Sequence, residues 1–201
     1  MTAASRPPLV LGSTSPYRRD LLARLRLDFS VAAPSVDETP RPGEAPADLA
    51  CRLARAKAKD VAAQHPQAVV IGSDQVADLD GQPIGKPGTH DRAVAQLRTM
   101  RGRRVVFHTA VCVLRPATGF AGLLLAPVGV QFRDLSDAEI ERYLRLEQPY
   151  DCAGSAKCET LGIALLDRID SDDPTALVGL PLMRTCALLR EAGIDPLAWP
   201  A

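Results

Sequence analysis

The order of hydrophobic and polar residues at the start of the chain predicts a strand, a polar loop and a helix. Residues 8–11 form a short apolar run that is typical of a strand, and Gly-Ser-Thr-Ser follows at positions 12–15. Pro16 suits the first turn of a helix that Ser15 caps, and the leucines that follow have the spacing of one buried face. The N–H groups of such a loop favour a bound anion at the helix N-terminus.

The next segment predicts a second helix and a central strand. The helix is expected from about Ala47 to Gln64, with Leu49, Leu53, Ala56 and Val61 turned inward. The β-branched run from Ala68 to Gly72 predicts a strand that ends at Ser73-Asp74-Gln75, and Asp80-Gly81 indicates a hairpin turn.

The second half of the chain continues the mixture of helices and strands. A capping box at Ser136 and Glu139 marks the start of one helix, and Pro149 ends it. Further expected elements are a helix over 89–100, two long strands over 104–115 and 120–132, a strand over 161–169 and a last helix over 181–193. This mixture predicts an α/β or α+β fold with a mixed sheet, and residues 1–201 contain no internal repeat.

Composition narrows the classes of partner. The 201 residues carry 24 Lys and Arg against 24 Asp and Glu, so the broad basic field that nucleic acid or an anionic membrane requires is missing. A polyanion bound here is therefore expected to be small and held by a local cluster of charges.

No signal for export is expected from the sequence. Residues 1–8 contain no apolar stretch, so no signal peptide is expected there, and the most apolar run, Gly122 to Val130, is too short to span a bilayer. The five cysteines form no C-x-x-C pair, which argues against a disulfide framework or a structural zinc site. These features predict a cytoplasmic protein with reduced cysteines.

Several charged residues lie beside sharp turns and are candidates for binding or catalysis. Arg18 follows the Ser/Thr loop, Asp74 follows an apolar strand, and Lys86 lies between Gly85 and Pro87. Each has a plainer interpretation, namely a solvated helix face for Arg18, a turn cap for Asp74 and a surface hairpin for Lys86.

Motifs of other enzyme classes are missing from the sequence. There is no G-x-x-x-x-G-K-[ST], H-E-x-x-H or G-x-S-x-G, and the three histidines have no metal-binding spacing. His108 falls in an expected strand, where a packed or hydrogen-bonded core role is favoured. A nucleophilic Cys–His pair is left open, but no feature of the sequence favours one. From composition and spacing alone, the chain is an α/β protein with a possible anion site.

Eight short stretches, taken together and in order, resemble the Maf family of nucleotide pyrophosphatases. They are Leu9 to Arg19, Asp37 to Pro40, Ala54 to Ala58, Gly72 to Val76, Gly85 to Pro87, Phe132 to Ser136, Cys152 to Ser155 and Leu177 to Pro181. The resemblance spans nearly the whole chain. It implies an elongated single domain, residues 1–201, with two lobes around a nucleotide-binding cleft. It also implies hydrolysis of a nucleoside triphosphate to the monophosphate and pyrophosphate.

The resemblance also implies roles for individual residues. Asp74 would be the general base that activates water, and Glu38, together with Asp74, would hold a divalent metal cation, Mg²⁺ or Mn²⁺. Ser13, Arg18, Lys57 and Lys86 would surround the triphosphate, with the two lysines as catalytic cations. These residue types fit the chemistry, because attack on phosphorus needs a proton acceptor and cations that offset negative oxygens.

Within the family, the sequence is similar to the branch that prefers 7-methyl-GTP. Ser73-Asp74-Gln75 and Cys152-Ala-Gly-Ser-Ala-Lys-Cys-Glu159 differ from the Ala-Asp-Thr and Lys-Ala-Gly-x-Tyr patterns of the dTTP/UTP branch. Tyr17, Gln75 and Glu159 stand at positions linked to base choice. A methylated guanine is cationic, so an aromatic face attracts it and a carboxylate can offset its charge.

Two other functions are weighed against this one. The first is a dTTP/UTP pyrophosphatase, and the second is a nucleotide-binding regulator of cell division without significant turnover. Intact Glu38, Lys57, Asp74 and Lys86 argue against an inactive binder, because binding alone does not need both acids. A homodimer is possible, and no nucleic acid or membrane partner is expected.

Overall fold

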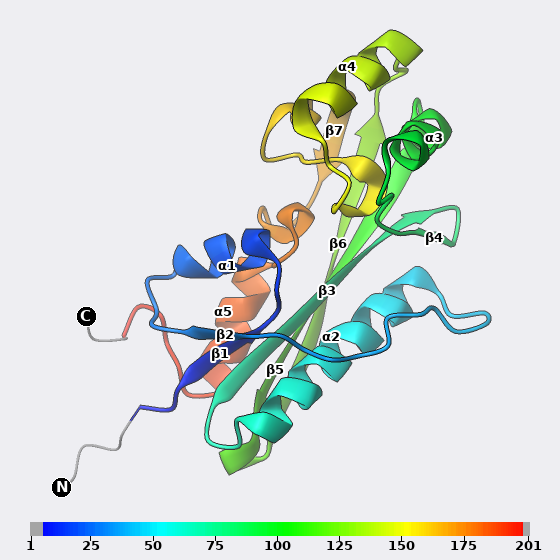
Figure 1. Cartoon of the computed structure of the whole chain (residues 1–201). Helices are drawn as coiled ribbons and strands as arrows, with labels where there is room; N and C mark the ends of the chain where they lie inside the picture. Colours follow the sequence, from blue (N-terminus) through cyan, green and yellow to red (C-terminus); the bar gives the residue numbers. More distant parts are fainter. Residues whose placement is uncertain (1–5, 199–201) are drawn as a thin grey trace, which may run out of the picture.

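The structure is a computed structural model that describes residues 6–198 (Figure 1). The expectation that no signal peptide begins at Met1 concerns a segment whose first five residues lie outside this range. Within residues 6–198, no helix combines the length and the apolar character needed to cross a bilayer.

A mixed sheet of seven strands forms the centre of the described chain, in the order β2-β1-β3-β5-β6-β7 with β4 paired to β3. The pairs β1/β2 and β1/β3 are parallel, and all later pairs are antiparallel. The predicted mixed α/β sheet is therefore confirmed. The strands are β1 (Leu9–Gly12), β2 (Ser30–Ala32), β3 (Val69–Leu79), β4 (Gln82–Ile84), β5 (Arg104–Arg115), β6 (Phe120–Phe132) and β7 (Leu166–Asp170).

Three of the five helices in residues 6–198 begin at a side-chain cap, and the sequence predicted two of these caps, Ser15 and Ser136. Ser15 and Thr89 each accept a hydrogen bond from a backbone N–H of the first turn, and Ser136 forms a complete capping box with Glu139. The helices are α1 (Pro16–Ala23), α2 (Pro46–Gln64), α3 (His90–Met100), α4 (Asp137–Glu147) and α5 (Leu182–Glu191). Short 3₁₀ turns are η1 (Pro116–Thr118), η2 (Ala153–Ser155), η3 (Leu161–Leu165) and η4 (Ala176–Val178).

The two faces of the sheet are covered differently, because successive side chains of a strand point to opposite faces. One face packs along its length on α2, with Val70 and Val76 of β3 in contact with this helix layer. On the other face, Val69 and Ile71 join a core beneath α1 and α5, whereas Ala77 belongs to a second core beneath α3 and α4. Figure 1 shows these two helix pairs at opposite ends of the long strands, so the molecule has two lobes.

Three sequence expectations need correction. The strand expected to end at Gly72 continues to Leu79, so Asp74 lies inside β3 and not at its end. The strand expected over 161–169 is the 3₁₀ turn η3 followed by β7, and the short strand β2 was not predicted. On α2, Ala56 is only partly buried, and Ala54 and Ala58 fill the inner face in its place.

Candidate functional site

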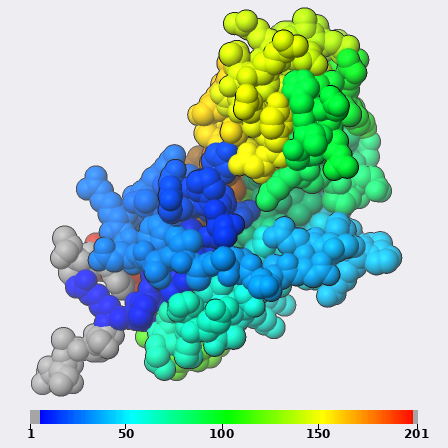
Figure 2. All heavy atoms as spheres, in the orientation of Figure 1, coloured from blue at the N-terminus to red at the C-terminus, as the bar shows by residue number. Residues whose placement is uncertain are grey.

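A cavity of about 550 Å³ opens beside a short length of β3 that has no neighbouring strand on one side. β1 ends at Gly12, which pairs with Gly72, and β4 pairs with β3 only from Ala77 onward. Residues 73–76 therefore form an open edge between two paired stretches. In Figure 2, blue atoms of the α1 region and yellow atoms from the 150–160 region meet beside this opening.

All residues that the sequence analysis singled out for the site line this one cavity. They come from the loop after β1, α1, the segment before α2, α2 itself, β3, the loop after β4 and the segment after η2: Ser13, Tyr17, Arg18, Glu38, Lys57, Asp74, Gln75, Lys86 and Glu159. We call Arg18, Glu38, Lys57, Asp74 and Lys86 the charged cluster. We call Tyr17, Asp151, Lys157 and Glu159 the aromatic cluster.

Lys57 is the centre of the charged cluster. Its Nζ lies 2.6 Å from Oδ1 of Asp74 and 2.5 Å from Oε1 of Glu38. Lys57 and Asp74 are both buried, whereas about half of the Glu38 side chain is exposed. One buried ammonium thus holds two carboxylates together at the cavity wall.

A close backbone contact seats this lysine. A Cβ on Gly72 would lie 2.4 Å from the carbonyl oxygen of Ala54 and 2.5 Å from the amide nitrogen of Ala58. Contacts that short do not occur, so only glycine lets α2 approach β3 this closely. The side chain of Lys57, on the same helical turn as these atoms, then reaches the Asp74 carboxylate two positions along the strand.

Glu38 is held in its charged form by the surrounding cations. Partial burial raises the pKa of Glu38, but the hydrogen bond and charge of Lys57, aided by Lys86 and Arg18, outweigh it and leave the pKa below the ordinary value. Glu38 is therefore a carboxylate at neutral pH.

Arg18 approaches the charged cluster from α1. Its Nε donates to the carbonyl oxygen of Gly179 at 2.8 Å, and Nη1 lies 3.5 Å from Oγ of Ser13. Burial lowers the pKa of Arg18, while the charges of Asp74 and Glu38 act in the opposite direction. No carboxylate lies within ion-pair distance of this guanidinium among residues 6–198. A partly buried arginine without an acid partner is suited to an anionic ligand.

Lys86 is exposed on the loop after β4, where it faces the cavity. The loop is fixed from two sides, because Gln96 donates to the carbonyl oxygen of Gly85 at 3.0 Å and the N–H of Gly88 donates to Tyr150 at 3.0 Å. The lysine therefore stands on a fixed loop at the wall of the same cavity.

The aromatic cluster joins the two lobes through longer contacts. The Tyr17 hydroxyl lies 3.3 Å from Oδ2 of Asp151, and Nζ of Lys157 lies 5.6 Å from the centre of the Tyr17 ring. Tyr17 is the one aromatic residue that lines the cavity in the described part of the chain. Glu159 is exposed at the same rim. This side of the cavity offers one aromatic face and two carboxylates.

Gln75 is occupied by the protein itself. Its amide nitrogen donates to the carbonyl oxygens of Ala176 and Leu177 and to the hydroxyl of Thr109, each at 3.0 Å. The amide oxygen remains the group of Gln75 that can face a ligand. The predicted role in base choice is thus limited to that oxygen or to the placement of η4.

The structure gives no support to a cysteine nucleophile. Cys152 lines the cavity, but burial, with the charge of Asp151, raises the pKa of its thiol to about 12. The thiol is therefore protonated at neutral pH and a poor nucleophile. His108 lies elsewhere, partly buried with Nε2 3.1 Å from Asp78, in agreement with the predicted hydrogen-bonded core role.

Comparison with known proteins identifies the family. A family model described as "Maf-like protein" matches residues 8–192. The chain belongs to the Maf family. Its nucleotide-pyrophosphatase resemblance, read from eight short stretches, is confirmed at the level of the family.

Relatives of this Maf protein include chains of high identity. Two proteins named 7-methyl-GTP pyrophosphatase, from Albidiferax ferrireducens and a Polaromonas species, are each 69% identical over 94% and 96% of this chain and 95% and 88% of theirs. A third of that name, from Thiobacillus denitrificans, is 57% identical over the whole of both chains. Among solved structures, the Staphylococcus aureus Ham1 protein matches with a TM-score of 0.47 and 18% identity over 63% of this chain and 72% of that one.

The carboxylates of this Maf protein fit the predicted divalent metal. Glu38 and Asp74 both contact one ammonium nitrogen, so the two carboxylates lie close together at the cavity wall. No cluster of three or more His, Cys, Asp or Glu that could hold a metal occurs within residues 6–198. Mg²⁺ is commonly bound by two carboxylates, and substrate phosphates and water complete its coordination.

Sequence reasoning missed the residues that support the site from behind. Thr109 and the carbonyl oxygens of Ala176, Leu177 and Gly179 position Arg18 and Gln75, but neither a lone threonine in a strand nor a backbone carbonyl leaves a recognisable sequence signal. Lys157 was also missed, because its aromatic partner, Tyr17, is distant in the sequence and only the fold brings the two together.

Proposed function

We propose that this chain is a nucleoside triphosphate pyrophosphatase that hydrolyses 7-methyl-GTP to its monophosphate and pyrophosphate. The observation that carries the proposal is the buried contact between Lys57 and Asp74 at the open edge of β3, with Glu38 on the same ammonium. The names of relatives up to 69% identical support the substrate. The cavity volume of about 550 Å³ suits one nucleotide.

In the proposed reaction, Asp74 removes a proton from a water molecule that attacks the α-phosphorus. The new bond joins the water oxygen to the α-phosphorus, and the bond from that phosphorus to the α–β bridging oxygen breaks. Pyrophosphate leaves with the electron pair. Lys57 contacts Oδ1 of Asp74 at 2.6 Å, so it orients the carboxylate and leaves the other oxygen to take the proton.

The cations of the charged cluster bind the triphosphate and offset the charge that develops on it. Arg18 approaches from α1, Lys57 from α2 and Lys86 from the loop after β4, so the phosphates lie among these three cations. Glu38 and Asp74 would hold a divalent cation, Mg²⁺ or Mn²⁺. When bound, this cation neutralises phosphate oxygens and increases the electrophilicity of the phosphorus.

The aromatic cluster recognises the base. The N7-methylated guanine ring is cationic, and Tyr17 offers it an aromatic face beside the carboxylates of Asp151 and Glu159. Glu159 can also accept hydrogen bonds from the guanine N–H donors, of which thymine and uracil have fewer. The same cluster therefore favours 7-methyl-GTP over both GTP and the pyrimidine nucleotides.

The test is pyrophosphate release from 7-methyl-GTP, GTP, dTTP, UTP and ATP at equal concentration, with Mg²⁺, with Mn²⁺ and with a chelator. We expect metal-dependent turnover with the highest kcat/KM for 7-methyl-GTP. A preference for dTTP or UTP would keep the reaction and reject the assignment of the aromatic cluster. Binding without turnover of any nucleotide would reject the enzyme and favour a nucleotide-binding regulator.

A further inference from the structure

A loop of residues 171–181, which we call the bridging loop, crosses the sheet face between the two lobes. Ala176 belongs to the core beneath α3 and α4, and Leu180 belongs to the core beneath α1 and α5. The loop contains η4 and forms one wall of the cavity through residues 177–179. A change in its position would therefore reach both lobes and the site together.

Backbone carbonyls of the bridging loop hold side chains of the site. The carbonyl oxygen of Gly179 accepts from Nε of Arg18 at 2.8 Å and from the hydroxyl of Ser73 at 3.1 Å. The carbonyl oxygen of Ala176 accepts from Gln75 at 3.0 Å. Because a guanidinium is planar, fixing Nε fixes the directions of the remaining donors of Arg18. The place of the loop thus decides where Arg18 points.

The loop is fixed in turn by the carboxylate of Asp173, which is fully buried. Oδ1 accepts the hydroxyl hydrogen bond of Thr175 at 3.1 Å, and Oδ2 accepts the backbone N–H of Arg184 at 3.1 Å. The guanidinium of Arg184 lies 3.7 Å from the same Oδ2. A buried carboxylate is retained only where such partners compensate its lost hydration.

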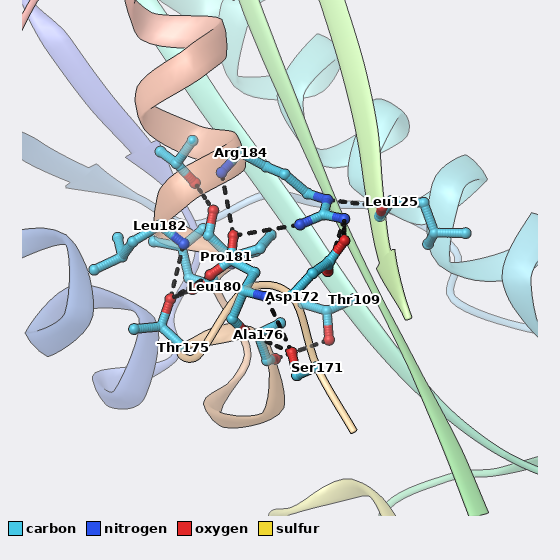
Figure 3. Close-up of polar contacts among 12 residues, drawn as sticks. Thr109, Leu125, Ser171, Asp172, Thr175, Ala176, Leu180, Pro181, Leu182 and Arg184 are labelled. Atoms are coloured by element: carbon cyan, nitrogen blue, oxygen red, sulfur yellow. Dashed lines mark hydrogen bonds and ion pairs between the residues drawn. The ribbon is translucent and has the colours of Figure 1, made fainter. Parts of the chain in front are cut away.

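Arg184 links this carboxylate to the sheet. Figure 3 shows its side chain reaching from α5 toward Leu125 of β6, whose carbonyl oxygen accepts from Nε at 2.9 Å. Its Nη2 also contacts both oxygens of Asp172 at 3.0 Å, but that carboxylate is mostly exposed. Figure 3 also shows Thr175 between Leu180 and Leu182, with hydrogen bonds of 2.9 and 2.8 Å. The buried acid and its arginine therefore tie the bridging loop to α5 and β6.

We infer that Asp173 is a positioning residue, which acts through the bridging loop to set Arg18 for the polyphosphate of the substrate. The chain of contacts runs from Asp173 to Thr175 and Arg184, through the loop backbone to the Gly179 carbonyl, and on to Nε of Arg18. Asp173 does not line the cavity, so it touches no substrate. The role in turnover rests on the proposed function, whereas the role in anion binding does not.

The experiment compares Asp173→Asn with Asp172→Asn, a neighbouring change that removes a carboxylate on the same arginine but an exposed one. Asparagine keeps the size of Asp173 and one acceptor oxygen, so the variant is expected to fold. Urea unfolding first gives the conditions under which every variant is fully folded. Under those conditions, calorimetry measures binding of inorganic tripolyphosphate, and kinetics measure kcat and KM for 7-methyl-GTP.

We expect Asp173→Asn to weaken tripolyphosphate binding and to lower kcat/KM, each by about tenfold to a hundredfold, because small misplacements of binding groups are costly. Asp172→Asn should change both by less than about twofold, in line with an exposed ion pair. In an Arg18→Lys background, Asp173→Asn should have little further effect, because lysine has no Nε–H to donate to the Gly179 carbonyl oxygen. This non-additivity separates positioning of Arg18 from a general loss of stability.

Each alternative outcome contradicts one claim. Unchanged tripolyphosphate binding in folded Asp173→Asn, or equal losses in the Arg18 and Arg18→Lys backgrounds, would overturn the positioning role. Absence of tripolyphosphate binding by the parent protein would overturn it too, since no phosphate site would exist to position. A parent that binds tripolyphosphate, loses it in Asp173→Asn and hydrolyses no nucleotide would retain the positioning role and reject the proposed reaction.

Discussion

The charged cluster and the aromatic cluster share one cavity but are built in different ways. Lys57 contacts Asp74 at 2.6 Å from a buried position, on a helix that packs directly against β3. Tyr17 contacts Asp151 at 3.3 Å, and Lys157 lies 5.6 Å from the Tyr17 ring, between segments that belong to different lobes. The central pair of the charged cluster, Lys57 and Asp74, stands on a helix and a strand in direct contact, whereas Tyr17 of the aromatic cluster reaches from α1 to loop residues of the other lobe.

This difference separates two tasks. Chemistry at phosphorus requires fixed geometry, which a strand and a helix in backbone contact can supply. Selection among bases requires side chains that can differ between relatives without disturbing the sheet, and loops tolerate such changes. We therefore expect variants of the charged cluster to affect all substrates alike and variants of the aromatic cluster to affect mainly the choice of base.

The largest effect is expected from Asp74→Asn. If Asp74 is the general base, kcat should fall by about 10² or more for every nucleotide tested, while the order of preference among bases stays the same. The matched control is Asp78→Asn on the same face of β3, whose carboxylate pairs with His108 outside the cavity. Steady-state pyrophosphate release measures both. Near-normal turnover of Asp74→Asn would show that Asp74 is not the general base. A changed order of preference among the bases would show that the charged cluster also affects base choice.

The second effect tests whether the charged cluster depends on the approach of α2 to β3. Gly72→Ala places a Cβ 2.4 Å from the carbonyl oxygen of Ala54, so the helix must move. Such overpacking costs about 1–3 kcal/mol of unfolding free energy, which urea titration can measure. Gly85→Ala is the control for stability, because its Cβ would meet no atom within 4 Å. Equal stability of the two variants would show that the close contact is dispensable.

The nine residues that the sequence singled out line one cavity, but the predicted end of the strand that carries Asp74 was wrong. Apolar runs and caps located the main helices and long strands, because those signals are local. Asp74 was expected at a strand end, since the apolar run stops at Gly72, yet β3 continues to Leu79. The strand that ends there is β1, and its end creates the open edge. Which strand beside β3 ends at this point depends on how the strands pair in the sheet. No local sequence pattern encodes that pairing.

The burial of Lys57 and the role proposed for Asp173 were hidden for a similar reason. A lysine on an amphipathic helix is ordinarily solvated, and only the approach permitted by Gly72 places Lys57 between two carboxylates. Asp173 follows a second aspartate in an apparent polar turn, so the sequence gives no sign that one is buried and the other exposed. The motifs that identified the family carried the site residues, while their supports required the fold.

A smaller effect is expected in the aromatic cluster from Glu159→Gln. The carboxylate is exposed, so its attraction for a cationic base is screened by water, and the ratio of kcat/KM for 7-methyl-GTP to that for GTP should fall by about two- to fivefold. kcat for GTP should hardly change. Glu147→Gln, which removes an acid of the same lobe outside the cavity lining, should leave the ratio intact. An equal loss of kcat/KM for both nucleotides would show that Glu159 acts in the common chemistry and not in the choice of base.

The smallest effect concerns the segment that brings Glu38 to Lys57. Glu44 pairs with Nε of Arg52 on α2 at 2.6 Å, and Nη2 of Arg52 donates to the carbonyl oxygen of Thr39 at 3.0 Å, next to Glu38. The hydrogen bond from Arg52, followed by that from the Arg41 backbone, lowers the pKa of Glu44 from the ordinary 4.5 to about 2. This ion pair extends the fixed part of the charged cluster to the loop.

A depressed carboxyl pKa gives stability that is present above the unfolded value and lost as the pH falls through the folded one. Glu44→Gln should therefore be slightly less stable than the parent at pH 6 and 7, by an amount that is constant there. The difference should shrink from pH 4.5 downward and vanish only below about pH 2. Urea midpoints across this range provide the measurement, and added salt should reduce the difference at neutral pH. A stability difference that grows as the pH falls would show that a group other than Glu44 stabilises this segment. The ion pair would then not extend the fixed part of the charged cluster.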